Sequence, residues 1–324
     1  MNFNLKSSNR TLAHSVAKHS NWKPEFITHS LKENGVYASR KEWKTFIYYA
    51  LLSLGLAFTV SGIIFFLAFN WADLHKFAKL GLVQGAIIVF IAAAIFSKAS
   101  ITVKNIFLMA ASITVGALFA VFGQIYQTGA NAYDFFLGWT VFISIWALIS
   151  RFPPLWLSLI MLINTTFLLY TEQVSKAFSD EEIYTILFAF NSLIVLCSEW
   201  LVSVGKIQDM PRWYVQSIAL AAFAFGTLTI STSIHDDFFP YGLISILIAI
   251  PLYYLAIRDS LQKKNIFYLC CVPLSIIIIL SSLLVKISYD EGMMLIITLF
   301  VIGSISFQIN QIITISKKWN GKAK

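Results

Sequence analysis

The chain has 324 residues, of which 58% are hydrophobic and 12% charged, and its formal net charge is +8. Soluble domains carry roughly 25% charged residues, and a soluble protein of this length could not keep so much apolar surface away from water. The composition therefore excludes an ordinary soluble domain and predicts a membrane protein. Basic residues gathered on the cytoplasmic side explain the positive charge better than nucleic-acid binding does.

Residues 1–45 are polar and lack the apolar core that a secretory signal requires. We expect them to form a short helical cytoplasmic segment. Ser39 and Glu42 have the spacing of a capping box. This spacing predicts that the first membrane helix begins near Arg40, one turn before the apolar sequence itself.

Ten apolar runs follow, each close to the roughly 17–25 residues that a spanning helix needs. They cover residues 46–70, 79–97, 104–125, 135–150, 154–171, 183–202, 214–232, 240–257, 266–285 and 293–314. The fourth run is short, so a re-entrant pair formed by the fourth and fifth runs, with eight full spans, is the alternative. The predicted fold class is all-α: a polytopic transmembrane helical bundle of about ten spans over residues 46–316, with a basic cytoplasmic tail at 317–324.

The basic residues predict the orientation of these spans. If the N-terminus is cytoplasmic and the loops alternate, 20 of the 24 Lys and Arg residues fall on the inside. Only Lys76, Lys79, Lys176 and Lys286 fall outside. Positive residues favour cytoplasmic loops, so both termini are expected in the cytoplasm.

The spans contain almost no ionisable residues, which argues against a proton-driven pump. Neutral polar residues inside the spans, and a polar, aromatic loop after the third span, are the candidate ligand or structural polar site. The candidates are Gln84, Gln124, Tyr126, Gln127, Asn131, Tyr133, Asp134, Asn164 and Asn191. Such groups also bond across helices and satisfy backbone at the membrane edge, so a purely structural role is the alternative to a ligand site.

The sequence from Gly123 to Trp139 carries a resemblance to a known family. It reads Gly-Gln-Ile-Tyr-Gln-Thr-Gly-Ala-Asn-Ala-Tyr-Asp-Phe-Phe-Leu-Gly-Trp and is followed by Trp146, Arg151, Phe152, Trp156 and Asn164. This pattern resembles the bacterial predicted membrane proteins named domain of unknown function 2157, best over residues 10–170. The resemblance implies a bacterial inner-membrane protein with a short cytoplasmic region before many helices, and it supplies no catalytic residues.

No catalytic motif or metal-ligand spacing is present in the sequence, so no cofactor or metal is expected. The leading hypothesis is a non-enzymatic membrane or envelope assembly component. Its expected partners are membrane lipids and a membrane protein or second copy, with no nucleic acid. The first alternative is a channel or transporter for a neutral or lipid-like solute, with a cavity lined by Gln84, Gln124, Asn164 and Asn191. The second is a membrane enzyme that uses Asp134.

Overall fold

A computed structural model describes Lys23, Glu25, Phe26, His29 and residues 39–319, apart from 128, 207–209, 237–239 and 289. Most of the predicted cytoplasmic segment at 1–45 and the last residues of the tail lie outside these described residues. The domain boundaries at 45 and 316 therefore stay predictions.

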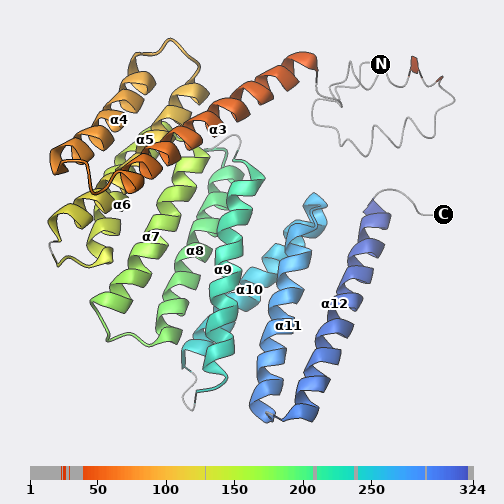
Figure 1. Cartoon of the computed structure of the whole chain (residues 1–324). Helices are drawn as coiled ribbons and strands as arrows, with labels where there is room; N and C mark the ends of the chain where they lie inside the picture. The colour runs from red at the N-terminus through yellow and green to blue at the C-terminus, as the bar shows by residue number, and fades with distance from the viewer. Residues whose placement is uncertain are drawn as a thin grey trace. The chain divides into compact units, whose positions relative to one another are not determined.

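The described residues form ten α-helices and no strand, which confirms the all-α prediction (Figure 1). The helices are α3 (Arg40–Phe69), α4 (Lys76–Phe96), α5 (Ile101–Tyr126), α6 (Ala132–Ser150), α7 (Pro153–Gln173), α8 (Asp180–Ser203), α9 (Arg212–Ser233), α10 (Pro240–Lys263), α11 (Phe267–Ile287) and α12 (Glu291–Trp319). All ten are long and apolar enough to cross a membrane. Because α6 and α7 each meet this condition, the structure favours ten spans over the eight-span alternative.

Side-chain caps define where several helices begin. The Ser39 backbone N–H donates to Glu42 Oε2 at 2.6 Å, and the Glu42 N–H donates to Ser39 Oγ at 3.2 Å. This reciprocal capping box confirms that the first membrane helix begins at Arg40. Before α12, Asp290 Oδ1 accepts the backbone N–H of Met293 at 2.7 Å. These bonds satisfy N–H groups that have no partner within their own helix.

The chain divides into two compact units, and the first comprises residues 1–111 with 315–324. Within it, the Lys79 ammonium lies 3.9 Å from the centroid of the Trp71 ring. Lys79 is only 7% exposed, so the aromatic face stabilises a charge that would otherwise be costly to bury. The contact joins the first turn of α4 to the loop that precedes it.

The second unit comprises residues 112–314 and is organised around α9. This helix has more buried residues than any other described helix, and it packs against α8, α10 and α11. A Cβ placed on Gly226 would lie 2.9 Å from the Phe188 ring of α8, which is fully buried. The glycine therefore allows the close approach of α8 and α9 on which the unit is built.

Candidate functional site

Two buried asparagines join α7 to α8. Asn164 Nδ2 donates to Asn191 Oδ1 at 3.1 Å, and Asn191 Nδ2 donates to Asn164 Oδ1 at 2.8 Å. Each amide also donates to a carbonyl one turn earlier in its own helix, Ile160 O at 3.0 Å and Leu187 O at 2.8 Å. Asn191 is 0% exposed and Asn164 9%. The amides thus satisfy one another in the interior, where water cannot do so.

A second polar contact, made only of hydroxyl groups, joins α9, α10 and α11. Ser275 Oγ lies 2.6 Å from Thr227 Oγ1 and 2.5 Å from Tyr253 OH. The Thr227 hydroxyl in addition donates to Phe223 O at 2.6 Å. Three neutral hydroxyls can form such a network without a charge, so it links three helices at little cost in desolvation.

A third polar contact joins the side chain of Gln308 in α12 to backbone carbonyl groups of α11. Pro273 has no N–H, so the carbonyl of Leu269, four residues earlier, has no helical donor. The side-chain amide of Gln308 in α12 donates to Cys270 O at 2.9 Å and to Leu269 O at 3.4 Å. A carbonyl without a donor costs about 2–7 kcal/mol in an apolar medium. Gln308 partly offsets this cost from the next helix, because its shorter bond goes to Cys270 O and its 3.4 Å contact reaches Leu269 O.

The polar loop before α6 is held by its own backbone and by the end of α7. Asp134 Oδ2 accepts the Asn131 N–H at 3.0 Å, and the Tyr133 N–H donates to Gln173 Oε1 at 3.0 Å. The rings of Tyr133 and Tyr170 lie 5.2 Å apart. Three of the predicted site residues thus take part in fixing how the chain enters α6.

Glycines bring α5 and α6 into close contact within the second unit. A Cβ on Gly116 would lie 2.6 Å from the Trp139 ring, and one on Gly123 would lie 2.8 Å from Phe135. Trp139 Nε1 also donates to Ser112 O at 2.7 Å. The glycine and aromatic residues of the Gly123–Trp139 stretch therefore shape a helix contact.

The remaining predicted site residues are all exposed. Gln84 is exposed on α4 in the first unit, and Gln124 and Tyr126 are exposed on the last turn of α5. Gln127 is exposed and has a positive φ of 44°. None of the nine predicted residues lines the cavity described next, and their role as a ligand site stays a prediction.

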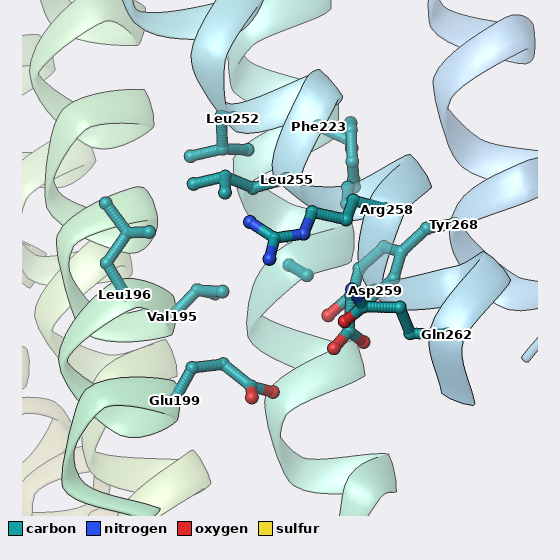
Figure 2. A pocket seen from close by; sticks show the side chains of 12 residues that line it. Val195, Leu196, Glu199, Phe223, Leu252, Leu255, Arg258, Asp259, Gln262 and Tyr268 are labelled. Atoms are coloured by element: carbon teal, nitrogen blue, oxygen red, sulfur yellow. The ribbon is translucent and has the colours of Figure 1, made fainter. Parts of the chain in front are cut away.

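A cavity of about 250 Å³ lies between α8, α9, α10 and α11. One part is apolar and the other is charged, as Figure 2 shows. The apolar part is lined by Val195, Leu196, Ala219, Phe223, Leu252, Leu255 and Ala256. The polar part is lined by Glu199, Arg258, Asp259, Gln262 and Tyr268.

Lys263 neutralises much of the negative charge at the polar end. Its ammonium lies 3.0 Å from Glu199 Oε2 and 2.6 Å from Asp259 Oδ1. Arg258 has neither a hydrogen bond nor an ion pair within the described part of the chain. Its guanidinium extends from α10 into the cavity, toward α8 (Figure 2).

Sequence reasoning missed this cavity, because none of its lining residues was among the predicted site residues. A sequence signal for the charged end is the four-residue spacing of Asp259 and Lys263, which allows an ion pair on one helix face. Nothing in the sequence predicted that Glu199, 64 residues before Lys263, would join them.

Among the described residues, no group of three His, Cys, Asp or Glu side chains could hold a metal ion. No curated protein and no solved structure matches the chain. A family match confirms the resemblance seen in the sequence: residues 27–156 match the family described as predicted membrane protein (DUF2157).

Proposed function

We propose that the protein is a non-enzymatic assembly component of the bacterial inner membrane. The observation that supports this proposal is the use of its buried polar groups. Two sets of buried polar side chains form hydrogen bonds between helices: the Asn164–Asn191 pair and the Thr227–Ser275–Tyr253 network. Groups used in this way stabilise a bundle and do not form a polar path through it.

We further propose that both termini lie in the cytoplasm. Two observations support this proposal: the number of helices long and apolar enough to span a membrane is even, and the distribution of Lys and Arg favours the inner side for both ends. Reporter fusions test this orientation. Fusions at Asp134 and Asp180 should report an external position, and fusions at Lys206 and Lys317 a cytoplasmic one. The reverse pattern would refute the orientation and leave the helix assignment unchanged.

The helix that we propose for contact with a partner membrane protein is α12. It is the described helix with no buried residue, and Gln308 directs one of its faces toward α11. Leu299 lies nine residues, or two and a half turns, before Gln308 and so faces the other way. It is 61% exposed.

Photo-crosslinking in cells tests this surface. A crosslinking residue at Leu299 should trap a protein partner. The matched control is Val301, seven residues before Gln308 and therefore on the face directed toward α11. Equal labelling from both positions, together with a protein that stays a monomer after gentle extraction, would contradict an assembly role.

A carrier for a lipid-like solute is the second candidate, and the cavity between α8, α9, α10 and α11 is the observation that favours it. If the protein is such a carrier, the purified protein reconstituted in liposomes should move a fluorescent lipid from one leaflet to the other. Transport that is absent from the reconstituted, folded protein would remove this candidate and leave the assembly role in place.

A further inference from the structure

We propose that the cavity between α8, α9, α10 and α11 binds one membrane lipid, a phosphoglyceride whose headgroup carries a phosphate and a primary ammonium. Phosphatidylethanolamine is the probe of this class. The inference goes beyond the assembly role and does not depend on it. It is carried by the apolar lining of the cavity, its volume and the charges at one end.

The cavity runs along α10 from an apolar part to a charged end. Its lining residues on α10 run from Leu252 to Gln262, and these ten steps of 1.5 Å span about 15 Å along the helix. The apolar lining residues on α10, Leu252 to Ala256, cover about 6 Å of this length. This is less than the roughly 15 Å of hydrocarbon in one leaflet, so the cavity lies within a single leaflet. In the orientation proposed above, this is the cytoplasmic leaflet, because α10 ends there at Lys263.

The apolar part of the cavity suits an acyl chain. Leu196 of α8, Phe223 of α9 and Leu252 of α10 present hydrocarbon and no hydrogen-bonding group. The volume of about 250 Å³ holds roughly eight groups of the size of a water molecule, about 30 Å³ each. The headgroup takes part of this volume and a methylene group is of similar size to water, so the cavity accommodates the headgroup and only the first few methylene groups of an acyl chain.

The charged end matches a headgroup with both signs of charge. Glu199 and Asp259 carry two negative charges against the single positive charge of Lys263, which leaves one negative charge in this trio. Arg258 adds one positive charge that has no described partner. A ligand with one phosphate and one ammonium neutralises both, the phosphate at Arg258 and the ammonium at the two carboxylates.

Arg258 is the cation that is available to the phosphate of such a ligand. It precedes Lys263 by five residues, so it lies about 7.5 Å nearer to the apolar run that ends at residue 257. The Arg258 side chain is exposed, so its donors are open to a ligand at the charged end of the cavity. Its planar set of donors fits two phosphate oxygens at once, and Figure 2 shows it directed into the cavity rather than away from it.

The experiment measures lipid affinity by native mass spectrometry of the full chain. Three lipids with identical acyl chains are compared: phosphatidylethanolamine, phosphatidylglycerol, which lacks the ammonium, and phosphatidylcholine, whose quaternary ammonium donates no hydrogen bond. We expect phosphatidylethanolamine to bind roughly tenfold more tightly than either, the factor for one charge-assisted hydrogen bond. Arg258→Gln should weaken the binding of all three lipids, and Glu199→Gln should remove only the preference for ethanolamine.

The matched control is Arg40→Gln, because Arg40 is an exposed arginine on α3, outside the cavity. It should leave all three affinities unchanged. Arg258→Lys keeps the charge without the paired donors and should give intermediate affinity, which provides a test if Arg258→Gln does not fold. Equal affinities for the three lipids, or an Arg258→Gln variant that behaves like Arg40→Gln, would overturn the proposal.

Discussion

The paired amides of Asn164 and Asn191 allow a quantitative test of how the bundle is held together. We consider Asn164→Leu, Asn191→Leu and the double variant. Leucine has the same branched arrangement of four side-chain heavy atoms as asparagine and no hydrogen-bonding group, although its methyl groups are bulkier. Each single change therefore removes both bonds between α7 and α8 and leaves the other amide with only the bond to its own helix.

The structure allows the magnitudes to be worked out. Hydrogen bonds between membrane helices contribute about 0.6 kcal/mol on average and at most about 1.7, so the two bonds at 3.1 and 2.8 Å predict a coupling of about 1–2 kcal/mol. Each single variant also leaves a buried amide oxygen unpaired, which costs about 1–3 kcal/mol. The double variant leaves none, so it should cost less than the two single variants together.

The assay is reversible unfolding in bicelles, analysed as a double-mutant cycle. Asn310→Leu is the control, because Asn310 is exposed on α12 and the same change there should alter the free energy of unfolding by less than about 0.5 kcal/mol. Single-variant effects that add to within about 0.5 kcal/mol in the double variant would refute the reasoning. The two amides would then be independent of one another.

Three further predictions concern α12, α5 and the start of α12. Gln308→Leu should lower the free energy of unfolding by about 1 kcal/mol in the natural chain and by less in a Pro273→Ala background, where the freed carbonyl regains a helical donor; an equal effect in both backgrounds, measured by the same unfolding assay, would contradict this. Gly116→Ala places a Cβ 2.6 Å from an indole ring and should lower stability by about 1–3 kcal/mol. Gly62→Ala, where nothing lies within 4 Å, should not, and a thermal melt compares the two. The backbone N–H of Met293 donates to the Asp290 carboxylate and is the larger cause of a pKa below the ordinary value of 3.8. The hydroxyl of Ser288 also donates and lowers the pKa further. The cap therefore stabilises α12 above pH 3.8 and is lost as the pH falls through the lowered pKa; hydrogen exchange of the first turn of α12 should rise there, and an unchanged pH response in Asp290→Asn would disprove the assignment.

The helices could be predicted from the sequence because the bilayer leaves the backbone few choices. Every backbone group in hydrocarbon needs a partner, and a helix supplies it locally. The capping box at Ser39 extended this reasoning to the residue at which α3 begins. The last helix continues to Trp319, five residues past the predicted apolar run, because a helix does not need apolar residues once it has left the membrane.

The partners of the polar side chains could not be predicted in the same way. Asn164 and Asn191 were recognised as polar groups within spans, but which amide meets which depends on the rotation of α7 against α8. That rotation is set by packing, such as the contact of Gly226 with Phe188, which has no one-dimensional signature. The cavity was missed for the same reason, since its charged end is assembled from α8 and α10.

The dependence of α11 on Gln308 has a consequence for the synthesis of the protein. Gln308 follows Pro273 by 35 residues, so at 5–20 residues per second the ribosome delivers it about 2–7 seconds later. During that interval the newly inserted α11 carries a backbone carbonyl without its final donor. The last two spans therefore mature as a pair, and a chain that stops within α12 before Gln308 leaves a defect in the preceding helix.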